Sequence, residues 1–174
     1  IRAVDYFENA GSWSKTVSNM LPGHSPPDTI LYFDNNNLIQ GIINEDLDGD
    51  SYAIDTLVLM PGNSPTLALF GNTWKSVQID PFTPDTTTIL QVFARIDSIS
   101  EIQAIGFSTG ENTIRYSLSG HEALDIEEWI PVYQGTNQVG SWQSYRLPLG
   151  DDWLAWYDSL SSITEIHFIN DQDD

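Results

Sequence analysis

A succession of short β-type segments, separated by turn-forming residues, constrains the fold of this chain more than any other feature of its sequence. The segments are rich in Thr, Ile, Val and aromatic residues, which suit half-buried strands. They cover residues 29–33, 37–43, 52–60, 66–70, 73–79, 86–96, 101–108, 113–118, 142–149 and 163–170. Turn-forming Gly, Pro, Asn and Asp gather between them, as in "PGHSPPD" and "MPGNSP". For a chain of 174 residues, this pattern predicts one all-β domain over residues 1–174, an antiparallel two-sheet β-sandwich.

One segment has helical periodicity instead. In "GDDWLAWYDSL", the large side chains recur at i, i+3, i+4 and i+7: Trp153, Trp156, Tyr157 and Leu160. This spacing places them on one face of a helix. Asp151 or Asp152 suits its N-cap. We therefore expect one short helix near 151–160, with Trp153 and Trp156 buried in the core.

Acidic residues dominate the charged side chains. The chain has 25 Asp and Glu against 6 Lys and Arg, which gives a formal net charge of -19. A field of this sign repels phosphate groups, so we expect no nucleic-acid partner. No apolar run approaches the ~20 residues that cross a bilayer, so we expect no membrane insertion. The acidic surface can also concentrate divalent cations. The chain has no cysteine, which excludes disulfides and metal sites built from thiolates.

The stretch "NEDLDGDSYAID", residues 44–55, has nearly the spacing of a calcium-binding loop. Oxygen-bearing side chains stand at positions 1, 3, 5 and 12, and they are Asn44, Asp46, Asp48 and Asp55. In EF-hand loops such side chains converge on one hard cation, and a glycine at position 6, here Gly49, permits the sharp turn. The shorter "DLDGDSY", which adds Asp50, resembles calcium loops between the strands of β-propellers. Because position 12 is Asp rather than Glu and the flanks are β-like, a plain Asp-Gly hairpin turn is the alternative.

Catalytic motifs are scarce in the sequence. The three histidines have no HExxH or HxH partner: His24, His121 and His167. Because His167 alternates with apolar residues in 163–170, we expect it on the solvated face of that strand. Glu127 and Glu128, beside Trp129, are the carboxylates best placed for acid–base work on a sugar. A solvated acidic loop is the alternative for this group.

Several stretches carry a family pattern when they are taken together. They are the opening "VDYFENAGSW", the central "ILQVFARIDSISEIQAIGF", and the closing "WQSYRLPL" and "ITEIHFIND". This succession of strands, spread over most of the chain, resembles the jelly-roll carbohydrate-binding modules of bacterial glycoside hydrolases. The resemblance implies a jelly-roll β-sandwich that binds polysaccharide without catalysis. Many such modules hold a structural calcium between the first and last strands, which implies Glu8 and Asp171 as ligands here.

The candidate sugar-binding residues lie outside the strongest core patterns. They are Trp74, Arg115, Tyr116, Trp129 and Tyr133. A pyranose ring stacks its C–H face on an aromatic ring, while its hydroxyls need hydrogen bonds from polar groups. Arg115 and Tyr116 are neighbours in one strand, so one of them faces outward. The alternative for each aromatic residue is a structural role, and for Arg115 it is an ion pair with a nearby acid.

The sequence therefore predicts a non-catalytic polysaccharide-binding module, extracellular and bacterial, that holds one or two calcium ions. Because the chain opens with "IRAVDYF", without Met or a leader, we expect it to belong to a longer multidomain protein. Two alternatives stay open. One is a small glycan-active hydrolase or lyase that uses Glu127 and Glu128. The other is a structural or adhesive surface domain, rigidified by calcium, that binds no sugar.

Overall fold

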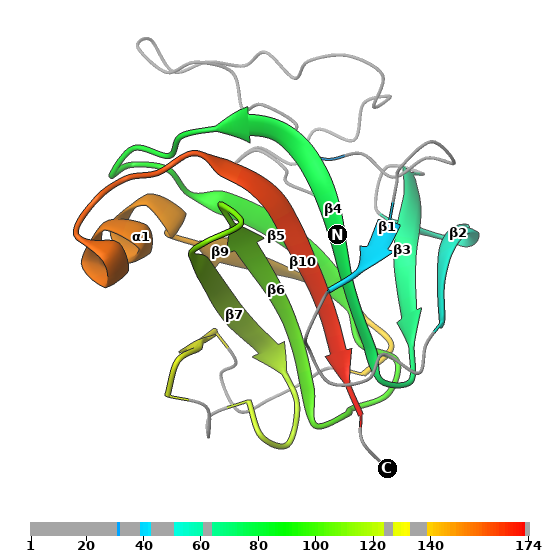
Figure 1. The fold of residues 1–174 in the computed structure, drawn as a ribbon. Helices are drawn as coiled ribbons and strands as arrows, with labels where there is room; N and C mark the ends of the chain where they lie inside the picture. The colour runs from blue at the N-terminus through cyan, green and yellow to red at the C-terminus, as the bar shows by residue number, and fades with distance from the viewer. Residues whose placement is uncertain are drawn as a thin grey trace, which may run out of the picture.

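The fold was obtained as a computed structural model. It describes residues 31, 39–42, 51–60, 64–123, 127–132 and 139–172 (Figure 1). Within these ranges, residues 39–41, 51–60 and 64 are described by their backbone alone. The described part is mainly β, as the sequence predicts, with one short helix.

The largest element is a six-stranded sheet with the order β1-β4-β10-β6-β7-β8. Its strands are β1 Ile39–Gly41, β4 Thr73–Phe82, β10 Ile163–Asp171, β6 Ile102–Ser108, β7 Thr113–Ser119 and β8 Ile130–Pro131. All neighbours in this sheet are antiparallel except β7 and β8, which pair in parallel over two residues. The expectation of a purely antiparallel arrangement is therefore wrong at this edge, where β8 is a strand that the sequence pattern does not predict.

Two further strand pairs lie against one face of this sheet. They are β2 Ser51–Met60 with β3 Ser64–Phe70, and β5 Leu90–Arg95 with β9 Trp142–Leu147. Figure 1 shows β5 and β9 behind the large sheet. The main core fills the space between these layers, and it joins Val92 and Leu147 to Phe107, Tyr116 and Phe168 of the large sheet. Leu67 and Leu69 of β3 pack against the same core.

The strand β5 starts at Leu90 rather than at residue 86, because the preceding residues form a turn. The Asp85 carboxylate accepts hydrogen bonds from the backbone N–H of Thr87 at 2.8 Å and from its hydroxyl at 2.7 Å. These two bonds, with further help from Thr88, lower the pKa of Asp85. An Asp side chain that binds its own backbone two residues on is typical of a turn. The Thr residues that read as strand in the sequence are therefore used to close this turn.

The helix α1, Leu149–Tyr157, lies close to the expected range but begins earlier. Neither Asp151 nor Asp152 is its N-cap, because both lie in the first turn. Gly150 lets the helix approach the Asp85 turn closely, since a Cβ there would lie 1.6 Å from the Asp85 carbonyl oxygen. No helix in the described ranges is long and apolar enough to cross a membrane.

The two tryptophans of α1 have different environments. Trp153 is 0% exposed and its ring lies 5.1 Å from that of Tyr157, as expected for a core residue. Trp156 is 45% exposed, so its predicted burial is wrong. The earlier start adds Leu149 and Gly150 to the buried side, which centres that side on Leu149 and Trp153 and leaves Trp156 at its margin.

This difference gives a matched pair of substitutions in one helix. We expect Trp153→Ala to lower the free energy of unfolding by ~3–5 kcal/mol, because it empties a fully buried site. Trp156→Ala should change it by about 0.5 kcal/mol or less, since nearly half of this residue is exposed and it lies at the margin of the buried side. Urea denaturation of both variants measures the two values, and equal losses would contradict the placement of the helix.

Candidate functional site

The large sheet has a second face, turned away from the main core. Alternation along each strand and the pairing register place one set of residues there. Strand by strand, the set is Trp74, Ser76 and Gln78 of β4; Glu165, His167 and Ile169 of β10; Ala104, Gly106 and Ser108 of β6; and Thr113, Arg115 and Ser117 of β7. We call these residues the outer face. The polar groups gather at one end of this face and the apolar ones at the other.

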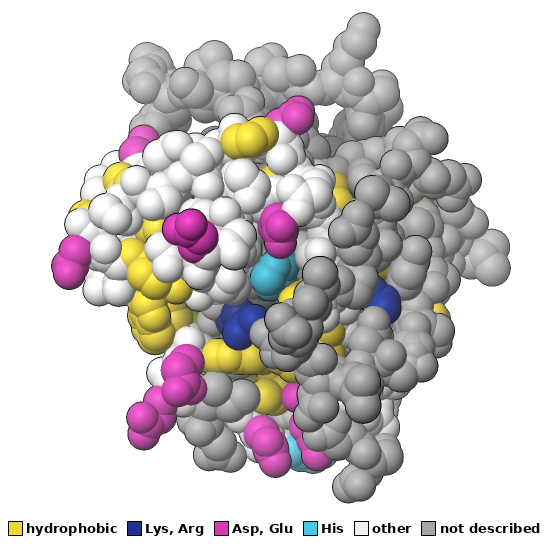
Figure 2. Space-filling model, in the orientation of Figure 1, with side chains coloured by type: hydrophobic (Ala, Val, Ile, Leu, Met, Phe, Trp, Pro, Cys, Tyr) yellow, Lys and Arg dark blue, Asp and Glu magenta, His cyan; other side chains and the backbone are white. Residues whose placement is uncertain are grey.

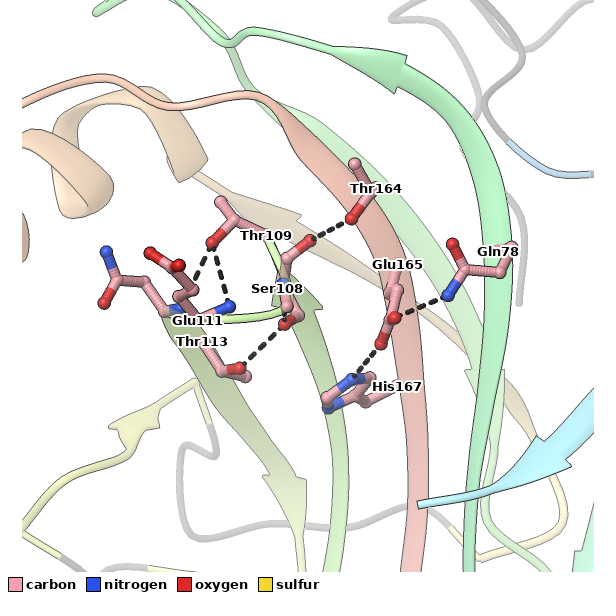
Figure 3. Close-up of polar contacts among 10 residues, drawn as sticks. Gln78, Ser108, Thr109, Glu111, Thr113, Thr164, Glu165 and His167 are labelled. Carbon is pink, nitrogen blue, oxygen red and sulfur yellow. Dashed lines mark hydrogen bonds and ion pairs between the residues drawn. The ribbon is translucent and has the colours of Figure 1, made fainter. Parts of the chain in front are cut away.

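The polar end carries two groups of hydrogen-bonded side chains, one on β4 and β10 and the other on β6 and β7 (Figure 3). The Glu165 carboxylate accepts a hydrogen bond from the Gln78 amide and lies 3.2 Å from Nε2 of His167. On the next strands, the Thr113 hydroxyl donates to the Ser108 hydroxyl at 3.0 Å. Carboxylate, amide, imidazole and hydroxyl groups are thus presented side by side, each held by a neighbour.

The apolar end is a second, smaller core. The rings of Trp74 and Trp129 meet edge to face, with centroids 5.8 Å apart. They pack with Ile102, Ala104 and Ile169, and with Ile42 at the margin. Trp129 stands just before β8, so it reaches this cluster from the far edge of the sheet. The small side chain of Ala104 leaves space on the central strand for two indole rings.

Arg115 joins the two ends of the outer face. Its guanidinium carbon lies 5.7 Å from the centroid of the Trp74 ring and 5.5 Å from that of Trp129. A cation within about 6 Å of an aromatic face is attracted by the ring quadrupole. Both rings therefore hold the guanidinium over the sheet, beside the polar groups.

Gly106 is the residue that lets Arg115 and His167 stand close together. It lies between them in the sheet, paired with His167 on one side and with Arg115 on the other. A Cβ at this position would lie 3.1 Å from Cβ of His167 and 3.3 Å from Cγ of Arg115. Glycine in the middle of a strand weakens it, so its use here indicates that space is needed.

Three of the five predicted sugar-binding residues come together on this face, namely Trp74, Arg115 and Trp129. The two rings are only 6% and 8% exposed, so neither is the exposed stacking platform that the sequence predicts. Tyr116 requires a correction, because it is fully buried in the main core and its hydroxyl donates to Asp152 at 2.8 Å. Burial, with the Asp152 carboxylate, raises the pKa of Tyr116 above its usual value. Tyr133 lies outside the described residues.

Most of the predicted calcium ligands also lie outside the described residues, namely Glu8, Asn44, Asp46, Asp48 and Asp50. Asp55 is in β2, where only the backbone is described. Asp171 ends β10, and its carbonyl oxygen accepts a hydrogen bond from the Glu101 N–H at 3.1 Å. In the part of the chain that the structure describes, no group of three or more His, Asp or Glu residues is arranged to hold a metal ion.

Glu127 and Glu128 are exposed in the turn before β8. The carboxylate and imidazole that the structure does bring together are those of Glu165 and His167, and sequence reasoning missed this pair. His167 is buried rather than solvated, contrary to expectation, since only 5% of it is exposed. The signal for this site was present in "ITEIHFIN", where Glu165 and His167 share the face opposite to Ile166 and Phe168.

Figure 2 looks at the molecule from the side of the outer face. A histidine and a basic side chain lie close together near its middle, with hydrophobic side chains below them and acidic ones mostly toward the periphery. In a chain with a net charge of -19, this places a cation and an imidazole inside an acidic surround.

Comparison with known proteins gives no relative for this arrangement. No family model matches the chain, and neither a curated protein nor a solved structure matches it.

The packing of Arg115 predicts that the planar shape of its guanidinium, and not its charge alone, contributes to stability. Arg115→Lys keeps the charge but loses the planar group between the two rings, so we expect a loss of about 1 kcal/mol in the free energy of unfolding. Arg95→Lys is the matched control. Arg95 pairs with Asp97 at 2.8 Å on the surface, where such a change should cost about 0.5 kcal/mol or less. Denaturant titration compares the two variants, and a larger loss in the control would contradict the role given to the rings.

Proposed function

We propose that this chain is a non-catalytic polysaccharide-binding domain and that the outer face is its glycan site. The observation that carries the proposal is the gathering of different hydrogen-bonding groups on one sheet face: Gln78, Glu165, His167 and Arg115. They come from three strands, β4, β10 and β7, with Gly106 and Ser108 of β6 between them.

The chemistry of these groups fits sugar hydroxyls. Each hydroxyl both donates and accepts, and a surface that binds several of them needs donors and acceptors at close spacing. Glu165 accepts, Arg115 donates, and Gln78 and His167 offer both functions. Because these side chains are already held by one another or by the rings, little side-chain entropy is lost when a ligand binds.

The indole rings have a supporting role in this proposal. Trp74 and Trp129 fix the position of Arg115 and form the apolar end of the face. Polar contacts therefore contribute most of the affinity, with ring edges as secondary contacts. This favours a hydroxyl-rich glycan segment lying on the sheet over a flat crystalline surface, which would need exposed rings.

The fold supports the proposal at a coarse level. Two strand pairs pack on one face of the six-stranded sheet, as the layers of a β-sandwich do. We extend this to the jelly-roll topology of carbohydrate-binding modules, on the resemblance carried by the strand pattern. The same resemblance supports an extracellular bacterial domain that is joined to other domains of a longer protein.

We also propose that the domain binds calcium, on the spacing in 44–55 and the charge of -19. A cation that binds only the folded state raises the melting temperature by mass action. We expect a higher melting temperature in millimolar calcium than in excess chelator, and a smaller difference for Asp48→Ala. Differential scanning fluorimetry with magnesium as the control ion measures this, and identical curves in calcium and chelator would remove calcium from the proposal.

A single glutamine tests the glycan site. A screen of soluble polysaccharides by affinity gel electrophoresis first identifies a retarding glycan. We then expect Gln78→Ala to weaken binding about five- to tenfold, the effect of one lost hydrogen bond of about 1–1.4 kcal/mol. Gln91→Ala is the matched control, since Gln91 is a strand glutamine of β5 whose amide donates to Ser144. Equal binding by the two variants would move the glycan away from the outer face.

The enzymatic alternative has one observation in its favour, the contact between Glu165 and His167. A carboxylate that orients an imidazole is a common acid–base arrangement. The same screen separates the two functions, because a hydrolase or lyase would release new chain ends from the glycan. Release by the parent that is lost in Glu165→Gln would replace binding by catalysis as the function.

A further inference from the structure

A cleft of about 360 Å³ lies beside the large sheet, where the second layer is divided. The pairs β2–β3 and β5–β9 are separate sheets, with no ladder between β3 and β5. The cleft occupies the gap between them. Residues 66–71 form one wall and residues 93–98 form the other. The large sheet contributes Gln103, Ala104, Leu118, Ile169 and Asn170 to the cleft. Its volume is at the lower end of the ~300–1,000 Å³ that is usual for ligand sites.

Aromatic rings line part of this cleft. Phe70 is 53% exposed at the end of β3, and Phe93 and Trp142 are half-buried on the paired strands β5 and β9. Aromatic side chains that gather around a concave space are typical of ligand sites. They supply flat apolar surface for one side of a small molecule.

Polar groups of fixed geometry line the rest. Arg95 is oriented by its contact with Asp97, with Nε 2.8 Å from the carboxylate oxygen. The Asn170 amide donates to the Gly71 carbonyl at 2.6 Å and accepts from the Ser100 hydroxyl at 3.2 Å. The Gln103 amide donates to the Ser98 carbonyl at 2.9 Å. The cleft thus combines rings with ordered donors and acceptors.

This combination narrows the class of ligand. A strongly anionic ligand is disfavoured, because the arginine in the cleft is paired with Asp97 and the protein is highly acidic. A purely apolar ligand is disfavoured, because it would displace the water around Arg95, Asp97 and Asn170 and could not replace the hydrogen bonds that this water makes. A neutral ring with an apolar face and several hydroxyl groups satisfies both kinds of surface.

We propose that the cleft between β3 and β5 is a second glycan site, which takes one or two neutral sugar units at the end of a chain. The choice of a sugar as ligand rests on the proposed function. The cleft itself is a separate site, because it contains none of the polar residues proposed for the outer face, which are Gln78, Glu165, His167 and Arg115. The concave shape suits a chain end, whereas the open sheet suits an internal segment. Two such sites on one domain would raise the affinity for a branched or bundled glycan by effective concentration.

Nuclear magnetic resonance of the whole chain, labelled with nitrogen-15, tests this. Cellobiose, laminaribiose, xylobiose and mannobiose are titrated separately up to tens of millimolar. We expect at least one of them to shift the backbone amides of 66–71 and 93–98 with saturation. Trp142→Ala should weaken that binding at least tenfold, while Gln78→Ala should leave it unchanged.

A second substitution blocks the cleft without emptying the core. Ser98 is exposed at the rim, so Ser98→Phe should fold normally and abolish the shifts. Ser162→Phe, exposed in the loop before β10, is its control. No shift in the cleft with any of the four disaccharides, or shifts that survive both Trp142→Ala and Ser98→Phe, would overturn the second site. Shifts confined to 76–78 and 165–167 would overturn it while supporting the outer face, and shifts confined to the cleft would support it while overturning the outer-face site.

Discussion

The pairing of β10 with β4 on one side and β6 on the other is the constraint on which the rest of the structure depends. This strand comes last in the described chain, yet it lies near the centre of the six-stranded sheet. Its alternation sends Ile166 and Phe168 into the main core and Glu165 and His167 to the outer face. A slip of one residue would exchange the two sets. Burial of two apolar side chains and exclusion of a carboxylate from the core therefore fix the register, and the register builds the candidate site.

Contacts with two aromatic rings help to position Arg115 on the outer face of this acidic protein. In so acidic a protein, a half-buried cation has many carboxylates to which it could be drawn. The rings of Trp74 and Trp129 also attract the guanidinium of Arg115, at 5.7 and 5.5 Å from their centroids. These ring contacts hold the arginine near His167, across Gly106. A lysine would not gain the same contact from two rings at once, because its ammonium lacks the planar surface.

Local pattern was enough to predict most of the strands, the helix and the burial of Trp153, because period and turn chemistry act over a few residues. It also selected Trp74, Arg115 and Trp129 individually. It did not show that Trp74 and Trp129, 55 positions apart, share one cluster, because that depends on sheet order. The prediction of Tyr116 as a sugar-binding residue was wrong for a related reason. Either Arg115 or Tyr116 could face the core, and the packing of Tyr116 against Phe107 determines that Tyr116 does. The close approach of His167 and Arg115 likewise depends on Gly106 of another strand.

The outer face and the cleft share strands of the large sheet. In β10, Ile169 packs in the tryptophan cluster and also borders the cleft, while Asn170 lines the cleft with its amide bound to Gly71. In β6, Ala104 likewise belongs to the tryptophan cluster and borders the cleft, next to Gln103, which also lines the cleft. A ladder bonded on both edges moves as a unit, so a shift of the strand on one side is transmitted to the other. Two ligands bound at these surfaces would therefore both act on β10. If they favour the same position of β10, each raises the affinity for the other, and if they favour different positions, each lowers it.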